Sequence, residues 1–359
     1  MRPWPDAPHR DRFDHVLPAR LDPAAPDLSA AAVAVVRQAL PAWERATAVT
    51  VRPLTGGITN ALLRVAASDQ PDVLVRVYGP ETERVIDRDR ENRLFAALSA
   101  RGMAPAYLGR FENGRVEGFL PGFRALEPAE LGAPRWQGGI AAALADFHAL
   151  PPAELLGEAA PARTFDTLRG WLDEARRVRL SGDRAARHAA LQLDRCAATL
   201  DRLQAAYAGG AVAGPAAATR TVLAHNDLLS GNILVEPATG AVRFIDFEYG
   251  DAGIAAFDVA NHFCEYAGFD SDFARRFPDA ARRRAFLARY LGAPPGSPDV
   301  AAFDDLVRFF VLVDHLWWGS WAVVQAAWSP IDFDFLAYAE ARIAGLAFHG
   351  ERWGQLGQG

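Results

Sequence analysis

Short hydrophobic runs, typical of β-strands, dominate the chain between residues 48 and 120. Five runs are predicted as strands: residues 48–54, 61–66, 73–78, 107–111 and 115–120. One amphipathic helix, at about 82–100, interrupts them. Residues 1–48 precede the strands as an extension with a single Ala-rich helix at 29–40.

The pattern changes to a helical period after Pro121 and Gly122, which break the last strand. Helices are predicted at residues 136–150, 164–187, 189–207, 255–268 and 303–328. We therefore expect an α+β protein with two lobes. The predicted parts are the extension at 1–48, a strand-rich N-lobe at 49–121 and a mostly helical C-lobe at 122–359.

Composition is that of a globular protein, with 50% hydrophobic and 23% charged residues among 359. The net charge of −6 argues against nucleic-acid binding. The longest apolar window carries Asp314, His315 and Gln325, which favours a buried helix over a membrane span. Two cysteines and a polar start without a signal peptide predict a cytoplasmic location.

Lysine is absent, and all 38 basic residues are arginine. Schiff-base and lysine-nucleophile chemistry are therefore excluded. Any side chain that pairs with a phosphate must be an arginine, which stays charged at all working pH values.

The spacing of three polar residues indicates phosphoryl transfer. His225, Asp227 and Asn232 form the pattern H-x-D-x-x-x-x-N, and Asp246 follows 19 residues after Asp227 at the end of an apolar run. In this chemistry a carboxylate takes the proton of the attacking hydroxyl, while an amide and a carboxylate oxygen hold Mg²⁺. We assign the base to Asp227 and the metal ligands to Asn232 and Asp246.

Two features of the N-lobe fit a nucleotide. Gly56, Gly57, Thr59 and Asn60 lie in a turn whose backbone N–H groups could face a phosphate, although an ordinary hairpin turn has the same composition. In a two-lobed kinase, the segment that joins the lobes presents backbone groups to adenine, which makes residues 117–120, with Phe119 and Leu120, the candidate hinge.

Arg76 lies inside an apolar strand and needs a partner. Glu91 lies on the buried stripe of the following helix, so we expect an ion pair between the two that keeps the ATP phosphates in register. The alternative is a surface arginine and a glutamate at the helix edge.

The helix after Asp246 carries a polar stripe, with Asp258, Asn261, His262 and Glu265 at positions i, i+3, i+4 and i+7. Such a stripe can be a solvent-exposed face. Alternatively, Asp258 braces the catalytic loop and Glu265 faces a cationic substrate.

The helix at 303–328 has a second, narrower arc that holds Asp314, Trp318, Trp321 and Gln325. Tyr338 follows soon after this helix. Aromatic stripes usually belong to the core, but tryptophans beside a carboxylate are also the wall that a small ammonium ligand requires.

Taken in order, these motifs resemble the choline/ethanolamine kinases, in the aminoglycoside-phosphotransferase-like branch of the protein-kinase fold. The resemblance runs from Thr55 to about His349 and rests on these segments: residues 56–60, 73–79, 87–89, 225–232, 244–249, 257–266 and 318–321. It implies an enzyme that uses ATP and Mg²⁺, with Asp227 as base and Asn232 and Asp246 as metal ligands. Family members carry arginine at the phosphate position, which agrees with Arg76.

The resemblance also implies a substrate group and its support. Glu265, Trp318, Trp321 and Tyr338 line the amino-alcohol pocket, Glu248 and Phe335 are grouped with them, and His225 joins Asp258 in supporting the loop. Phe335 stands where choline kinases tend to have tyrosine, and the motifs are closer to ethanolamine kinases. Choline, another aminoalcohol or an aminoglycoside remains an alternative substrate. The alternative to an enzyme is a pseudokinase, a binding module that keeps the fold and has lost phosphoryl transfer. The sequence leaves the oligomeric state, including a homodimer, open.

Overall fold

The computed structural model describes residues 15–54, 60–79, 86–157, 161–329 and 331–352. The chain divides into two compact units. The first comprises Met1–Arg124, Leu234–Thr239 and Arg243–Tyr249, and the second comprises the remainder. The first unit ends three residues after the lobe boundary expected at residue 121. The return of two later segments to it was not expected.

A six-stranded sheet forms the first unit. Its strand order is β1 (Val16–Leu17), β5 (Tyr107–Phe111), β6 (Gly114–Gly118), β4 (Gln70–Tyr78), β3 (Asn60–Ala67) and β2 (Thr50–Leu54). Only the β1–β5 pair is parallel among these described strands; the others are antiparallel. All five strands predicted from the hydrophobic pattern are confirmed, whereas the two-residue β1 was missed.

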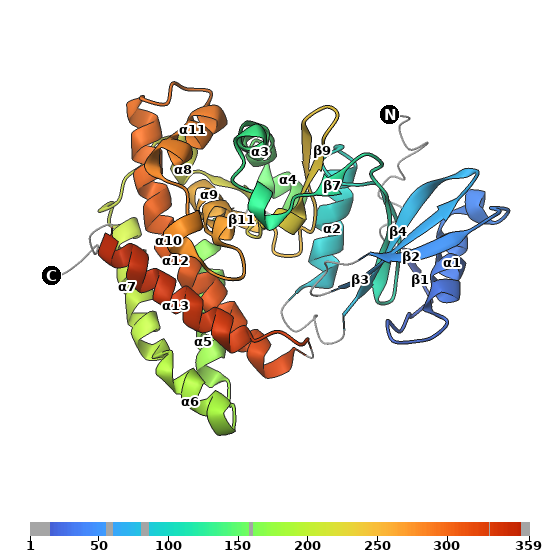
Figure 1. The fold of residues 1–359 in the computed structure, drawn as a ribbon, viewed down its shortest axis with the longest axis horizontal. Coiled ribbons are helices and arrows are strands. Elements are labelled where there is room, and N and C mark those ends of the chain that lie inside the picture. The colour runs from blue at the N-terminus through green and yellow to red at the C-terminus, as the bar shows by residue number, and fades with distance from the viewer. Residues whose placement is uncertain (1–14, 55–59, 80–85, 158–160, 330, 353–359) are drawn as a thin grey trace. The chain divides into compact units, whose positions relative to one another are not determined.

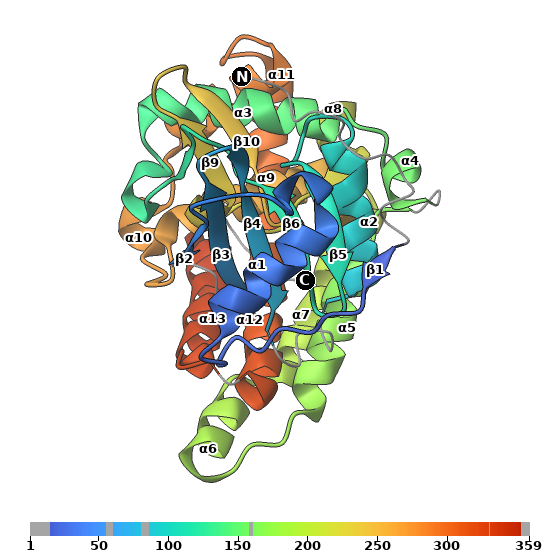
Figure 2. The same cartoon turned by 90° about the vertical axis from the view of Figure 1, so that its right-hand side faces the viewer.

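The two faces of this sheet carry different chemistry, because side chains alternate along each strand. Val73, Val75 and Val77 of β4 point into a core covered by α1 (Leu28–Ala39), which lies across the sheet (Figure 2). Arg76 and Tyr78, on the opposite face, belong with α2 (Arg88–Ser99). The predicted extension thus supplies a helix and an edge strand to the unit.

The second unit is mainly helical. Its helices are α3 (Pro134–His148), α4 (Pro152–Leu156), α5 (Thr164–Arg177), α6 (Gly182–Ala190), α7 (Leu193–Ala208), α8 (Ala216–Thr219), α9 (Ala255–Cys264), α10 (Phe273–Arg276), α11 (Ala280–Leu291), α12 (Pro298–Trp328) and α13 (Phe335–Arg352). Short strands β8 (Thr221–Ala224) and β11 (Asp251–Ile254) pair antiparallel. The remaining strands, β7 (Arg124–Ala125), β9 (Ile233–Glu236) and β10 (Ala241–Phe244), form a sheet of order β10-β9-β7; they are not confined to the second unit, since each includes residues assigned to the first.

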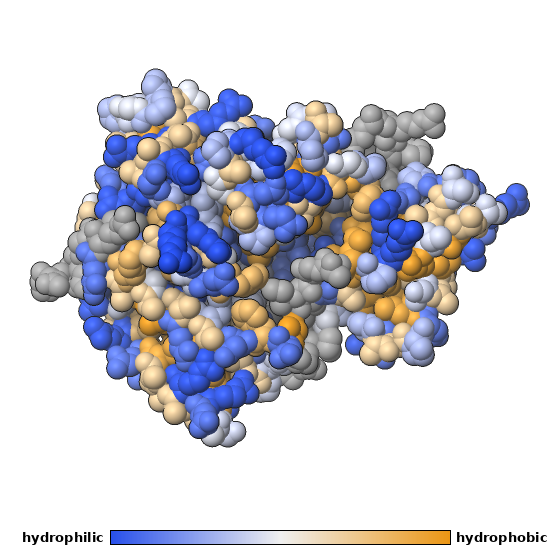
Figure 3. Space-filling view, viewed as in Figure 1, coloured by the Kyte–Doolittle hydropathy of each residue, from blue (hydrophilic) through white to orange (hydrophobic). Residues whose placement is uncertain are grey.

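Helix α12 is the core of this unit, as its apolar sequence predicts. It begins at Pro298, with the Ser297 side chain as N-cap, and packs along α13, α9 and α5 (Figure 1). None of the described helices is long and apolar enough to cross a membrane. On the face seen in Figure 3, hydrophilic and hydrophobic residues are interspersed over the unit.

Three helix predictions needed correction. The helix expected at 164–187 is two helices, because α5 ends where Val178 leaves the helical region (ψ 138°) and α6 starts only after the extended Ser181. The helix expected from residue 189 starts at Leu193, after Gln192 at φ +51°. The helix expected to run to 268 ends at Cys264 and continues as a 3₁₀ turn. Extended backbone at Val178 ends the α-helical ladder in the first case, and the left-handed Gln192 interrupts it in the second.

Candidate active site

The catalytic loop, residues 225–232, joins β8 to β9. Asp227 and Asn232 are buried there, each 8% exposed. The Asn232 side-chain amide donates to the Asp227 backbone carbonyl and to Asp227 Oδ2, both at 2.9 Å. These bonds fix the rotation of the carboxylate and turn Asn232 Oδ1 away from it. The predicted base and one predicted metal ligand are therefore neighbours.

Asp258 of α9 braces this loop, as predicted. Its carboxylate accepts the backbone N–H of His225 and of Asn226, each at 2.7 Å, and lies 2.9 Å from His148 Nε2. Burial would raise the pKa of Asp258, but His148 and the His225 amide hold it below its ordinary value. One helix side chain thus fixes two consecutive peptide units.

The polar stripe of α9 is not a solvent-exposed face. Asp258, Asn261 and His262 are all fully buried. Asn261 accepts the backbone N–H of Leu228 at 2.8 Å and donates to Asp314 of α12 at 3.1 Å. The stripe therefore links the catalytic loop to the arc of α12 on which the tryptophans lie.

Glu265, at the end of this stripe, is a carboxylate with a side chain 9% exposed that is incompletely neutralised. Its nearest cation, Arg342 of α13, lies at 3.6 Å and makes a closer ion pair with Asp314. Burial raises the pKa of Glu265 to about 7; Arg342 lowers it and Asp314 raises it. A carboxylate held in this state favours a cationic ligand.

Several aromatic side chains of α12 and α13 lie in the same unit as Glu265. Trp318 and Trp321 meet edge to face at 5.2 Å, and Trp321 meets Phe335 at 5.7 Å. Tyr338 is buried, and its hydroxyl lies 3.4 Å from Arg342 NH1. We call these five residues, Glu265, Trp318, Trp321, Phe335 and Tyr338, the carboxylate–aromatic cluster.

Tyr338 relates this cluster to the catalytic loop. Burial raises the pKa of its hydroxyl, Arg342 lowers it, and the charges of Glu265, Asp314 and Asp227 raise it further. Asp227 is thus close enough to act on the cluster electrostatically. The predicted base and, apart from Glu248, the predicted substrate residues all belong to the second unit.

In the first unit, Arg76 is buried as expected, but its partners differ from the prediction. It donates to Glu117 at 2.8 Å and to Asp246 at 3.3 Å. Glu91 is bonded instead to Arg115 at 2.5 Å and to Arg88 at 2.7 Å. The expected direct Arg76–Glu91 pair is replaced by a network in which both residues take part.

The strand register explains why Arg76 and Glu91 have partners other than each other. Arg76 and Arg115 face each other across β4 and β6. Two like charges in that position repel unless carboxylates separate them. Glu91 and Glu117 supply these charges: the pKa of Glu91 falls to about 2, and that of Glu117 falls below its ordinary value, because burial, which raises both, is outweighed by the arginines.

Arg115 was not predicted as a site residue. Glu117 was predicted to lie in the hinge, but it lies within β6 and is 2% exposed. The signal was available, because Arg115, Val116 and Glu117 alternate polar and apolar and thereby put both charges on one face. Arg342 was also missed; its position four residues after Tyr338 puts both on one face of α13, but this spacing does not show that the face is buried.

Other predicted residues lie in the same unit. Asn60 accepts from Arg88 at 3.3 Å, and Glu248 pairs with Arg88 at 3.2 Å. Burial and the charge of Asp246 raise the pKa of Glu248 to about 7, against the lowering effect of Arg88. These contacts place Glu248 beside Arg88 and Asp246, and its substrate role stays a prediction. Gly56, Gly57 and Thr59 fall outside the described residues.

The predicted hinge residues follow β6. The N–H of Phe119 donates to the Asp72 carbonyl at 3.1 Å, and its ring lies 4.1 Å from the Arg64 guanidinium. Leu120 accepts from the N–H of Phe123 at 3.3 Å. The Phe119 N–H is therefore already used within the sheet and is not the group presented to adenine.

A strand-rich unit with a buried arginine and a helical unit with an Asp–Asn catalytic loop define a phosphotransferase with a protein-kinase-like fold and an alcohol acceptor. The family model described as choline/ethanolamine kinase matches residues 51–346. The chain belongs to the choline/ethanolamine kinase family.

Individual relatives cover most of the chain. It is 34% identical over 299 residues to a probable ethanolamine kinase of Arabidopsis thaliana, covering 80% of this chain and 76% of that protein. It is 32% identical over 329 residues to probable choline kinase 2 of the same plant, covering 86% and 89%. The solved ethanolamine kinase of Plasmodium vivax is 27% identical with a TM-score of 0.77, covering 90% and 89%.

Proposed function

We propose that the chain transfers the γ-phosphoryl group of ATP to the hydroxyl of ethanolamine, giving phosphoethanolamine and ADP. One observation carries this choice of substrate class. Glu265 is a carboxylate with a raised pKa and a side chain only 9% exposed, and Arg342 lies between it and the Tyr338 hydroxyl in the unit that also holds the catalytic loop. A small ammonium ion would supply the missing positive charge.

Asp227 is the proposed base. It accepts the proton of the ethanolamine hydroxyl as that oxygen bonds to the γ-phosphorus, and the bond from phosphorus to the bridging oxygen of ADP breaks. The Asn232 amide keeps one carboxylate oxygen of Asp227 in a fixed position. The brace from Asp258 keeps the loop backbone in place.

Asn232 and Asp246 are the proposed Mg²⁺ ligands, and their oxygens fit the donor set that this ion prefers. The Asn232 amide nitrogen is turned to Asp227, which leaves its carbonyl oxygen as the ligand. Asp246 belongs to a buried network of the first unit that also contains Arg76. When bound, Mg²⁺ neutralises charge on the transferred phosphoryl group.

Arg76 is the proposed phosphate-pairing residue, supported by its anchoring to Glu117 and Asp246. Gly56, Gly57, Thr59 and Asn60 would face the phosphates, Glu91 would hold the network around Arg76, and Phe119 with Leu120 would border adenine. A cytoplasmic location is part of the same proposal.

Choline is the second candidate. The faces of Trp318, Trp321 and Phe335 suit a quaternary ammonium, which binds through aromatic rings alone. Glu265 and the Tyr338 hydroxyl favour a primary ammonium, which can donate three hydrogen bonds. Phe335 has no hydroxyl that could accept a hydrogen bond from a primary ammonium. Discrimination between ethanolamine and choline would therefore depend on Glu265 and Tyr338.

The test is release of ADP by the purified chain with ATP, Mg²⁺ and either ethanolamine, choline or an aminoglycoside. We expect the highest kcat/KM with ethanolamine. Absence of turnover with all three would overturn the kinase assignment, and equal or faster turnover of choline would overturn the ethanolamine preference.

Two variants test the assigned roles. Asp227→Ala should lower kcat at least about a hundredfold while ATP binding survives. Arg76→Ala should raise KM for ATP more than KM for ethanolamine. An active Asp227→Ala enzyme would show that another group takes the proton.

A further inference from the structure

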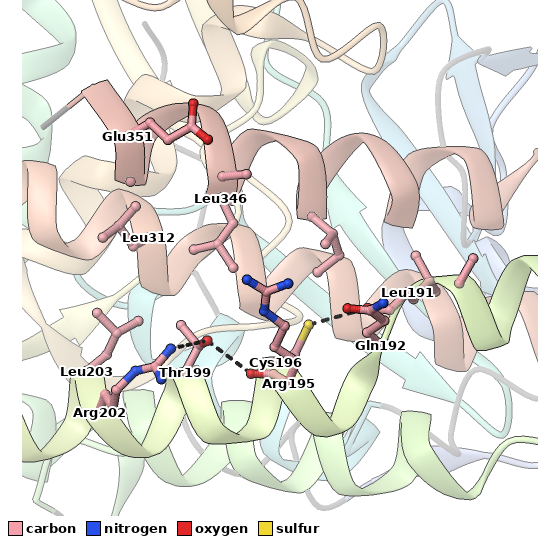
Figure 4. Close-up of a pocket in the computed structure, with 14 residues that line it drawn as sticks. Leu191, Gln192, Arg195, Cys196, Thr199, Arg202, Leu203, Leu312, Leu346 and Glu351 are labelled. Carbon is pink, nitrogen blue, oxygen red and sulfur yellow. Dashed lines mark hydrogen bonds between the residues drawn. The ribbon is translucent and has the colours of Figure 1, made fainter. Parts of the chain in front are cut away.

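A groove runs between α7 and α13, with α12 as its floor, in the second unit (Figure 4). Its volume is about 330 Å³, within the range of small-molecule sites. Apolar side chains form most of its lining: Leu191, Leu203, Leu312, Ile343, Leu346 and Ala347. We call it the α7–α13 groove.

Two arginines of α7 give this groove a positive rim. Arg195 extends over the centre of the groove, and Arg202 lies along its edge, bonded to the Thr199 hydroxyl at 3.0 Å (Figure 4). Both are exposed. Within the described ranges, neither forms an ion pair with a carboxylate. Glu351, at the end of α13, points away from Arg195 (Figure 4).

The acidic residues next to these two arginines on α7 are paired with other arginines. Asp194 pairs with Arg176 at 2.6 Å, and Asp201 pairs with Arg169 at 2.8 Å, both toward α5. Helix α7 therefore neutralises its acids on the face toward α5 and presents uncompensated cations on the face toward α13. An apolar trough beside these cations is complementary to a ligand with one anionic end and one apolar end.

We propose that the α7–α13 groove binds a single-chain carboxylate amphiphile, such as a medium-chain fatty acid. The carboxylate pairs with Arg195 first and Arg202 second, while the acyl chain covers Leu312, Leu346 and their neighbours. Cys196, buried in the groove wall with its thiol directed to the Leu191 carbonyl at 3.7 Å, contributes apolar surface. The geometry supports this site independently of the phosphoryl transfer.

Calorimetric titration of the full chain with decanoate, below its micelle concentration, tests the proposal. We expect saturable binding to one site, weakened about tenfold or more by Arg195→Gln and less by Arg202→Gln, because charge-assisted hydrogen bonds are lost. Higher salt should weaken binding as well. The matched control is Arg289→Gln, an exposed arginine of α11 outside the groove, which should bind decanoate as the unaltered chain does.

Three ligand controls separate charge from apolar contact. Decanol lacks the anionic end, decyltrimethylammonium reverses it, and acetate lacks the chain; each should bind at least about tenfold more weakly than decanoate. Equal affinity for decyltrimethylammonium, an Arg195→Gln variant that binds unchanged, or absence of saturable binding would each overturn the proposal. The ADP assay on the same variants checks that they are folded, and we expect unchanged turnover.

Discussion

Two buried arginine–carboxylate networks, one in each unit, use the same residue types with opposite electrostatic results. In the first unit, Arg115 and Arg88 lower the pKa of Glu91 to about 2. In the second, Arg342 is engaged closely by Asp314, and burial raises the pKa of Glu265 to about 7. Proximity to an arginine therefore does not by itself tell whether a carboxylate is neutralised.

The difference separates a scaffold from a binding site. A carboxylate whose pKa is lowered stabilises the fold above its unfolded pKa, and this stability is lost as the pH falls through its folded pKa. A carboxylate whose pKa is raised lowers the stability of the folded protein when it is ionised. Binding of a cation beside it restores that stability. The first network holds a sheet face together, whereas the second prepares a place for an ammonium ion.

The largest expected effect is on the first network. Glu91→Gln removes a charge with a pKa that Arg115 and Arg88 hold well below its ordinary value, and leaves Arg115 buried without that partner, which should cost about 3 kcal/mol. Urea unfolding at pH 7 should show this loss of stability. The matched control is Asp89→Asn on the same helix; Asp89 pairs with Arg110 but is 64% exposed, so its loss should cost less than about 1 kcal/mol.

The corresponding change in the second network should have the opposite sign. Glu265→Gln removes a carboxylate whose ionisation costs stability, so at pH 8 it should raise the free energy of unfolding by up to about 3 kcal/mol. KM for ethanolamine should rise about tenfold or more, with little change in KM for ATP. A Glu265→Gln protein that is less stable would contradict the comparison. Glu174→Gln, on α5, is the control, since the Glu174 side chain is 47% exposed.

The pH dependence sharpens this prediction. Glu265 faces Arg342, Asp314 and Tyr338; its own pKa is raised to about 7, whereas the pKa values of Tyr338 and Arg342 are raised further above their already high ordinary values. Below that pH it is protonated and loses its attraction for the ammonium ion, so kcat/KM for ethanolamine should rise as the pH increases through about 7. Measured at saturating ATP, the pH profile of kcat/KM should be flat in Glu265→Gln. If the variant shows the same slope as the unaltered chain, the pH dependence belongs to another group.

The smallest effect is expected at the surface of α6. Arg187 pairs with Glu340 at 2.7 Å and with Asp334 at 3.0 Å, next to the start of α13. These groups are partly exposed, so Arg187→Gln should lower stability by no more than about 1 kcal/mol. A loss as large as that of Glu91→Gln, in the same urea titration, would show that exposure does not distinguish these pairs.

Local sequence predicted what depends on local structure. The strands of the first unit, helix α12 and the loop around Asp227 follow from period and spacing, and Asp258 could be assigned because it lies on one stripe with Glu265. The partners of Arg76 could not be predicted, because they depend on the register that places Arg115 opposite it. Arg342 is one arginine among many, and only the packing of α13 against α12 shows that it is buried.

The brace on the catalytic loop also limits how the chain can vary in length. The backbone N–H groups of His225, Asn226 and Leu228 all donate to side chains of α9. An inserted residue between positions 225 and 228 would shift the later amides out of step with Asp258 and Asn261. The three hydrogen bonds thus fix the number of residues between His225 and Leu228. Insertions or deletions in this loop would have to lie after Leu228.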